Sequence, residues 1–423
     1  MKLSARLALF VVAVLFAAVE MRAQENSAVR PRVVATATQE QKTPPPPALP
    51  QAKPADTATN FPVIEAQKKV SMPVNLTPSV IQSRITEAQR MFKTKPKPTA
   101  MSVPSVPSIE FVTVAALDRE TGRTHFITLS KETFLTKGAE LNTTTSEGTN
   151  VNLRIIRANG VNTALTIFTP EGKSLAPLTV EYPIERGGKY LETAYYTSAH
   201  PALLSTDLAR SGQSYVRNML DLAAKRLRDK GVAISPQLVD VAERLCVVEH
   251  VDHDRFRAEN RLALYDEIYS LFALNQLDTY RYSVSSAGAG GMVQMIPWAY
   301  NLERTRYPSV GLIPDFVVGM RNHGNALQAM LLYMHDTWNE MTANEEVQYA
   351  LNAKIATPSE LLAAGYNSNA AKLPGYLKRG GNDWRTLIPR ETQMYLQIYK
   401  SFESLVPIQT RATDNTASIR GQN

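Results

Sequence analysis

The chain has 423 residues but only one cysteine, Cys246, which excludes an intramolecular disulfide bond. No cysteine is available for lipid attachment near its start, and beyond the N-terminal region no segment approaches the roughly twenty apolar residues of a transmembrane helix. The 46 Lys and Arg residues outnumber the 39 Asp and Glu residues but form no long run, which argues against a nucleic-acid partner. We therefore expect a globular protein with no disulfide, no transmembrane segment in the mature chain and no nucleic-acid partner.

The N-terminal residues have the pattern of a secretory signal peptide. Lys2 and Arg6 precede an apolar run over residues 7–19, and a candidate cleavage point follows Ala23. This pattern predicts that residues 1–23 are removed and that the protein is exported to the periplasm or cell envelope. A large chain without disulfides also fits a bacterial envelope protein better than a small secreted domain.

Proline is concentrated in the next part of the chain, where 14 of the 26 prolines lie between residues 31 and 107. Residues 24–107 are therefore predicted to be a proline-rich tether, mostly disordered. One interruption, over residues 80–92, has the apolar spacing of a short amphipathic helix, whose apolar face is expected to dock onto another surface that the sequence does not identify.

The residues after the tether predict an α+β multidomain protein, with a small β domain at 108–200 followed by an all-α domain at 201–408. Short runs of β-branched and aromatic residues, broken by turn signals at 119–122 and 170–172, indicate a sandwich or barrel of about seven strands. Residues 409–423 are polar and are predicted to be disordered. Apolar residues at three and four spacing predict helices over 213–230, 236–250, 258–276, 325–340, 345–353, 358–364 and 390–403.

One acidic residue stands out at the end of the second of these helices. Val241, Leu245 and Val248 mark its buried face, and Glu249 follows Leu245 by four residues, so its carboxylate projects near the same apolar stripe. Desolvation there favours the protonated form, which is what a general acid near neutral pH requires. The alternative is a glutamate at a helix end that reaches solvent.

Four short segments of the helical domain carry polar and small residues typical of a binding site. In chain order they are Glu249 with His250, then Gly291-Met292-Val293-Gln294, then Gly365-Tyr366-Asn367, and last Glu391-Thr392 with Tyr395. Their content and order resemble the soluble lytic transglycosylases, whose helical fold is similar to goose-type lysozyme. The resemblance covers the helical domain only. It leaves the β domain as an accessory binding module or a spacer.

The resemblance implies a site and a reaction. Glu249 would be the catalytic residue for cleavage of the β-1,4 bond between N-acetylmuramic acid and N-acetylglucosamine in peptidoglycan, with formation of 1,6-anhydro-muramic acid and without a metal or organic cofactor. The residues expected to contact the glycan strand are His250, Gly291, Met292, Gln294, Tyr366, Asn367 and Tyr395. Side-chain-free backbone over residues 288–291 is expected to admit a sugar ring, with an apolar face from Met292 and an amide from Gln294.

Two departures from the family pattern concern the substrate. His250 stands where the family has serine, and Glu249 and Gln294 are 45 residues apart because a helix-like segment at 258–276 intervenes, which is expected to roof the cleft. Three alternatives remain open: a catalytically weak wall-binding module, a lysozyme-type hydrolase, and a metallohydrolase built on His250 and His253. Cell-envelope proteins are further candidate partners, through the tether or the β domain.

Overall fold

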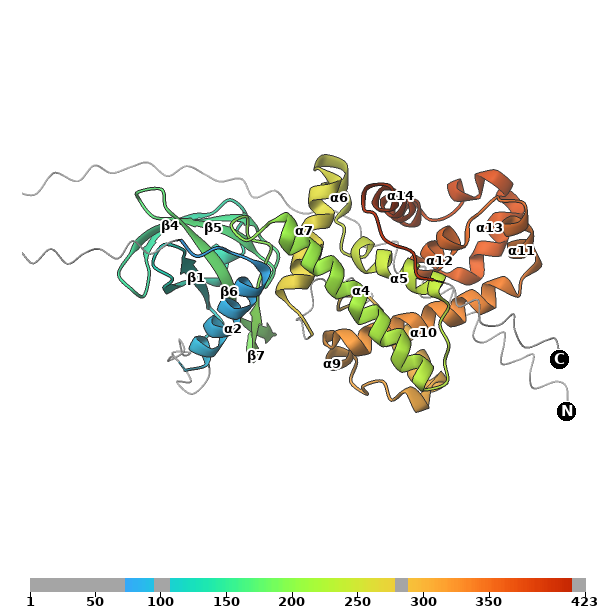
Figure 1. Ribbon diagram of the computed structural model, residues 1–423, viewed down its shortest axis with the longest axis horizontal. Helices are drawn as coiled ribbons and strands as arrows, with labels where there is room; N and C mark the ends of the chain where they lie inside the picture. The colour runs from blue at the N-terminus through green and yellow to red at the C-terminus, as the bar shows by residue number, and fades with distance from the viewer. Residues whose placement is uncertain (1–72, 95–106, 278–287, 413–423) are drawn as a thin grey trace, which may run out of the picture. The chain divides into compact units, whose positions relative to one another are not determined.

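The computed structural model describes residues 73–94, 107–277 and 288–412, and every structural statement below concerns these residues (Figure 1). The predicted signal peptide, most of the predicted tether and the last eleven residues lie outside them. No helix in these ranges is long and apolar enough to cross a membrane.

The β domain contains seven strands in one antiparallel sheet, as the sequence predicts. The strand order is β2-β1-β6-β5-β4-β3, and β7 pairs with the part of β6 from Val180 to Arg186, beyond the residues that pair with β5. A short helix, α3 (Lys131–Phe134), follows β2. The strands are β1 (Phe111–Asp118), β2 (Thr124–Ser130), β3 (Glu140–Thr144), β4 (Asn150–Arg157), β5 (Ala164–Phe168), β6 (Ser174–Arg186) and β7 (Lys189–Tyr196).

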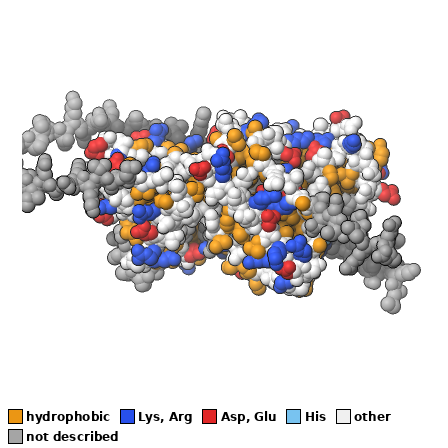
Figure 2. Space-filling model, in the orientation of Figure 1, with side chains coloured by type: hydrophobic (Ala, Val, Ile, Leu, Met, Phe, Trp, Pro, Cys, Tyr) orange, Lys and Arg blue, Asp and Glu red, His pale blue; other side chains and the backbone are white. Residues whose placement is uncertain are grey.

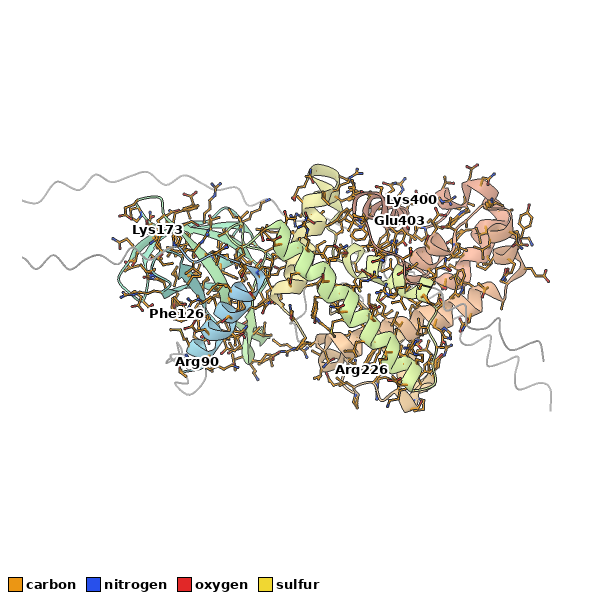
Figure 3. All side chains as sticks on the ribbon, viewed as in Figure 1. Arg90, Phe126, Lys173, Arg226, Lys400 and Glu403 are labelled. Atoms are coloured by element: carbon orange, nitrogen blue, oxygen red, sulfur yellow. The ribbon has the colours of Figure 1, made fainter. Side chains whose placement is uncertain are left out.

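The sheet curls into a near-barrel, because the segment after β3 returns to β2. The backbone N–H of Ser146 donates to the carbonyl of Phe126 at 2.9 Å, and the side chain of Thr145 lies 3.1 Å from His125 Nδ1. Both predicted turns are present, 119–122 between β1 and β2 and 170–172 between β5 and β6. Lys173, labelled in Figure 3, ties the two turns together through an ion pair of 2.7 Å with Asp118.

The predicted amphipathic helix is α2 (Pro78–Thr94), and its docking is confirmed. Its apolar face, Ile81, Ile85, Ala88 and Phe92, is buried. The hydrophobic cluster around this face takes residues from both the β domain and the helical domain: Ala115, Leu117, Phe126, Ala176, Leu178, Leu203, Leu208, Ala273 and Leu274. This part of the predicted tether is thus folded.

All seven predicted helices are present, with ends shifted by up to seven residues. The largest shift is at α4, which begins at Thr206 because the Ser205 side chain caps it, accepting a hydrogen bond from the N–H of Leu208 at 3.1 Å. The predicted helices are α4 (Thr206–Asp229), α5 (Pro236–Val248), α7 (Arg261–Leu274), α10 (His323–Thr342), α11 (Glu345–Asn352), α12 (Pro358–Asn367) and α14 (Arg390–Leu405). Shorter helices not predicted are α6 (His253–Ala258), α8 (Pro297–Arg306), α9 (Phe316–Arg321) and α13 (Leu373–Gly380), with 3-10 turns at Pro308–Val310, Ala370–Lys372 and Gly381–Thr386.

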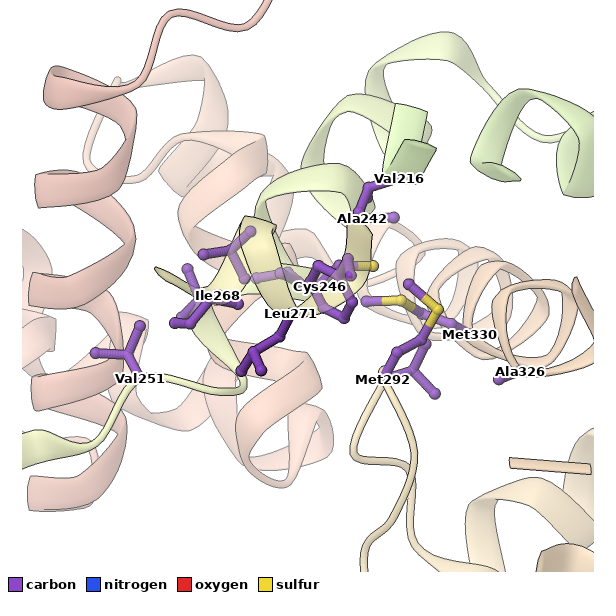
Figure 4. Packing of buried hydrophobic residues seen from close by; sticks show 14 of the residues in the cluster. Val216, Ala242, Cys246, Val251, Ile268, Leu271, Met292, Ala326 and Met330 are labelled. Atoms are coloured by element: carbon purple, nitrogen blue, oxygen red, sulfur yellow. The ribbon is translucent and has the colours of Figure 1, made fainter. Parts of the chain in front are cut away.

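Helix α5 lies at the centre of the helical domain. It packs against α4, α7, α10, α12 and α14, and ten of its thirteen residues are buried. Figure 4 shows Ala242 and Cys246 of α5 within the same apolar cluster as Ala326 and Met330 of α10. Because α5 is enclosed along its length, a side chain of α5 can reach a functional site only at the C-terminal end of the helix, next to Glu249.

Helix α7, predicted to roof a cleft, is instead a core helix. Nine of its fourteen residues are buried, among them Tyr265 and Tyr269, whose rings lie 5.0 and 6.2 Å from Phe402 of α14. Its second half, from Ile268 to Leu274, is buried without interruption, as in a helix of a domain interior. The expectation of a roof is therefore wrong.

The prediction of a disordered tail is also wrong for its first residues. The chain is described to Ala412, and the guanidinium of Arg411 is held by three carboxylates. Its Nη1 lies 2.8 Å from Asp240 and 2.7 Å from Glu243 of α5, and its Nε lies 2.7 Å from Asp221 of α4. These ion pairs join residues that are far apart in the sequence. The local composition of the tail therefore could not predict that Arg411 is held in place.

The surface carries no dominant sign of charge on the face shown in Figure 2. Lys and Arg side chains there are interspersed with Asp, Glu and apolar side chains. This distribution agrees with the scattered basic residues of the sequence.

Candidate functional site

Glu249 directly follows the last residue of α5 and caps the helix, with its backbone N–H bonded to the carbonyl of Leu245 at 3.0 Å. The residue as a whole is partly exposed. The hydroxyl of Tyr395, from the distant helix α14, donates a hydrogen bond of 2.6 Å to Glu249 Oε1. Tyr395 is itself only 3% exposed, so this donor is held by packing.

The surroundings of Glu249 favour a protonated carboxyl. Desolvation raises the pKa of Glu249 to about 8, the negative charge of Glu391 adds to the increase, and the hydrogen bond from Tyr395 partly opposes it. The carboxyl is thus largely protonated at neutral pH, and the residue that carries it is partly exposed. This combination is what general acid catalysis needs.

His250 fixes the neighbouring turn. Its Nε2 lies 2.9 Å from the carbonyl oxygen of Met292, which can only accept, so we assign the proton to Nε2. Burial lowers the pKa of His250 to about 4, and its ring meets that of Phe272 edge to face at 5.7 Å. The histidine is therefore neutral near pH 7, with its Nε2–H directed at the turn.

The glycine-rich turn closes on itself. Gly290 and Met295 form an isolated antiparallel bridge, with the N–H of Gly290 bonded to the carbonyl of Met295 at 3.2 Å. Gln294 takes a positive φ of 46°, and its Nε2 donates to the carbonyl of Gly291 at 2.7 Å. The Gln294 side chain remains partly exposed, but part of its hydrogen-bonding capacity is spent on the turn.

Gly291 does not have the role predicted for it. Its φ is +72°, and a Cβ at this position would lie 2.4 Å from the carbonyl oxygen of Met320 in α9. The space that the missing side chain leaves is filled by the protein's own backbone rather than being open to a sugar. Gly291 is thus required by a close backbone approach.

Met292 likewise differs from expectation. Its side chain is fully buried, and Figure 4 shows it pointing into the apolar cluster that contains Cys246 and Met330. It therefore presents no apolar face to a sugar ring. What Met292 contributes to the site is its carbonyl oxygen, which holds His250.

The third segment meets the same turn from α12. The hydroxyl of Tyr366 donates to the carbonyl of Val293 at 2.6 Å, and Asn367, the last residue of α12, is partly exposed beside it in sequence. Burial raises the pKa of Tyr366, and the charge of Glu249 raises it further, which shows that the two groups are near each other. Tyr333 of α10 supports the Tyr366 ring edge to face at 5.9 Å.

The structure therefore brings all four predicted segments together. Glu249 meets Tyr395, His250 meets the turn at Met292, and Tyr366 meets it at Val293. The sequence did not single out the supporting residues Phe272, Met320 and Tyr333. Each of these lies in an ordinary helical pattern, so no local signal distinguishes it from other core residues.

His250, one of the two histidines of the metal alternative, and the two acidic residues that flank His253 are engaged in other contacts. Asp252 caps α6 by accepting from the N–H groups of Asp254 and Arg255 at 2.9 Å, and Asp254 pairs with Arg257 at 2.9 Å. The ring of His250 is bonded to Met292. Within the described ranges, no group of three or more His, Cys, Asp or Glu side chains is arranged to hold a metal ion.

Comparison of the chain with protein-family models, with curated proteins and with solved structures gives no match.

Proposed function

We propose that the protein is an exported peptidoglycan lytic transglycosylase with a lysozyme-like helical domain. The observation that carries this proposal is the carboxyl of the partly exposed residue Glu249, which accepts a hydrogen bond of 2.6 Å from Tyr395, a residue of another segment that the resemblance selects. The proposal is supported by the environment as well as by the motif order, because that environment keeps a carboxyl protonated at neutral pH.

In the first step Glu249 protonates the oxygen of the β-1,4 bond between N-acetylmuramic acid and N-acetylglucosamine as that bond breaks. Tyr395 occupies Oε1, so we assign the transferred proton to Oε2. The acetamido group of the substrate stabilises the cationic carbon, so a second carboxylate is not needed as nucleophile.

In the second step the Glu249 carboxylate takes the proton from the sugar's O6 hydroxyl, and O6 bonds to the cationic carbon to close the 1,6-anhydro ring. The same burial that raises its pKa makes the ionised carboxylate a stronger base. Tyr395 stabilises the carboxylate between the two steps by its hydrogen bond. One residue thus acts first as acid and then as base, with no metal or organic cofactor in either step.

Substrate contacts are proposed for the partly exposed residues Gln294, in the glycine-rich turn, and Asn367, at the end of α12. Tyr366 and His250 act by holding the turn from two sides, through the carbonyls of Val293 and Met292. Export, and attachment to envelope proteins through the tether or the β domain, belong to the same proposal.

Mass spectrometry of the products tests the reaction. Digestion of purified peptidoglycan by the full mature chain is expected to release fragments with 1,6-anhydro-muramic acid ends, and Glu249→Gln is expected to release none. Binding to the wall without any product would instead indicate a catalytically weak binding module.

A lysozyme-type hydrolase is the second candidate, and one observation favours it. Glu391, exposed in the first turn of α14, lies near enough to Glu249 for its charge to raise the pKa of that residue. A second carboxylate could activate water in place of O6. Reducing muramic acid ends among the products would identify this reaction.

A further inference from the structure

One large aromatic side chain near the site is left largely open. Trp298, in the first turn of α8, is 61% exposed. The other two tryptophans are covered, since Trp384 is fully buried and Trp338 is partly buried against the core. An open indole offers a ligand one of the largest apolar faces of any side chain, together with an N–H donor.

Trp298 is close to the site along the chain. It follows Val293, whose carbonyl accepts from Tyr366, by five residues, which cannot span more than about 18 Å even when fully extended. The bridge between Gly290 and Met295 folds part of this stretch back and shortens it. The next two residues, Ala299 and Tyr300, are buried, so the indole lies on the opposite, solvent-facing side of α8.

On α8 itself, the exposed residues that follow the indole at helical spacing are polar. Asn301 and Thr305, which share the exposed side of α8 at helical spacing, both face solvent. A protein-docking surface is typically a contiguous apolar patch, whereas here a single flat aromatic ring is followed by an amide and a hydroxyl. A pyranose ring has the complementary form, with apolar C–H groups on its face and polar groups around its edge.

We propose that Trp298 is a platform on which a sugar ring of the glycan strand stacks, outside the bond that is cleaved. This inference rests on the proposed function and adds a specificity-determining residue to it. The stacked sugar would fix the strand beside the Glu249 carboxyl, so Trp298 contributes to substrate binding and leaves the chemical step unchanged.

Isothermal titration calorimetry with soluble β-1,4 oligomers of N-acetylglucosamine tests the platform. The full mature chain carrying Glu249→Gln serves as background, so that no cleavage occurs. Adding Trp298→Ala is expected to weaken binding about tenfold, and Trp298→Phe to restore part of the loss, because an aromatic face remains. Tyr349→Ala is the matched control, since Tyr349 is 65% exposed on α11 and is expected to leave affinity unchanged.

On peptidoglycan, Trp298→Ala in the otherwise wild-type chain is expected to raise KM about tenfold and to leave kcat within twofold. Unchanged affinity and KM in Trp298→Ala, or no binding of the oligomers by the parent chain, would overturn the platform. If Glu249→Gln abolishes cleavage while Trp298→Ala has no effect, the platform fails and the proposed function stands. If Glu249→Gln retains cleavage while Trp298→Ala still weakens binding, the catalytic assignment fails and the platform stands.

Discussion

Two glutamates of the helical domain have pKa values raised to about 8, and burial is the largest cause for both. Glu249 lies at the open end of α5, is partly exposed and accepts a hydrogen bond from Tyr395. Glu303 lies in α8, is fully buried, and neither of its oxygens has a hydrogen-bond partner within the described ranges. A raised pKa therefore does not identify a catalytic acid by itself; access and a positioned donor distinguish the two residues.

The surroundings of Glu303 make the contrast sharper. The neighbouring carboxylate, Asp336 of α10, accepts hydrogen bonds from Arg306 and Tyr307, and Arg306 also reaches Glu340 at 3.2 Å. The nearby positive charge is thus already paired, and the negative charge of Asp336 raises the pKa of Glu303 further. Glu303 is stable there only in its neutral form.

Glu360 of α12 completes the comparison as a buried carboxyl that is fully paired. It is 5% exposed, and its oxygens lie 2.6 Å from Arg385 and 2.8 Å from Lys400, which Figure 3 labels on α14. Despite burial, the hydrogen bonds from these two residues lower its pKa to about 2. The three glutamates thus lie in three different environments, whose effects can be separated by substitution.

Glu249→Gln is expected to have the largest effect. It keeps the size and hydrogen-bonding shape of the side chain, but an amide can neither donate the proton of the first step nor accept the proton of the second, so turnover of peptidoglycan should fall by about a hundredfold to ten-thousandfold. Thermal stability should hold, because a neutral amide costs no more to bury than a carboxyl. Turnover and melting temperature measured on the same preparation check both expectations.

The control for this variant is Glu403→Gln, which makes the same change on the outer part of α14, where Glu403 is 45% exposed. It is expected to keep wild-type turnover. Activity of Glu249→Gln within a few fold of wild type would remove the catalytic assignment.

Glu360→Gln tests the paired carboxyl through stability. We expect a loss of about 1–3 kcal/mol in the free energy of unfolding at pH 7, because Arg385 and Lys400 lose a charged partner. The pKa is lowered in the folded state, so the stabilisation is fully present above the unfolded value near 4.5 and is lost as pH falls toward about 2. Urea unfolding at pH 7 and pH 3 checks this, and equal losses at both pH values would contradict the pairing.

Glu303→Gln should change the pH dependence of stability and leave turnover at neutral pH within a few fold of wild type. The pKa of Glu303 is raised on folding, so its contribution is fully present below pH 4.5 and is lost as pH rises toward about 8. Between pH 5 and pH 8, wild type is therefore expected to lose roughly 1–3 kcal/mol relative to the variant. Parallel stability curves for the two proteins would show that Glu303 does not titrate in this way.

Much of this architecture follows from sequence periodicity. The seven strands, the seven longer helices and the docked helix α2 were predicted because apolar spacing directly reflects which face of an element is buried. The convergence of Glu249, the glycine-rich turn, Tyr366 and Tyr395 also agrees with the order of their motifs.

The errors have a common physical cause. Gly291, Met292 and Arg411 were misread because their partners, the carbonyl of Met320, the cluster around Met330 and the carboxylates of α4 and α5, are distant in sequence. A glycine such as Gly291 leaves free space beside the backbone, and either a ligand or another part of the protein's own backbone can fill that space. Sequence composition predicts that space, but only the packing shows what fills it.

The smallest expected effect is a shift in the pH profile, and it tests what most separates Glu249 from Glu303, the hydrogen bond from Tyr395. Because the acid form of Glu249 starts the reaction, kcat/KM should be level below its pKa of about 8 and fall above it. Tyr395 donates to the carboxylate and so holds that pKa down. Tyr395→Phe should therefore move the alkaline limb upward by about one pH unit and lower the plateau only a few fold. Tyr399→Phe, one turn further along α14, is the matched control and should leave the alkaline limb of the pH profile in place. If the alkaline limb of Tyr395→Phe stays fixed or moves to lower pH, the hydrogen bond from Tyr395 does not lower the pKa of Glu249.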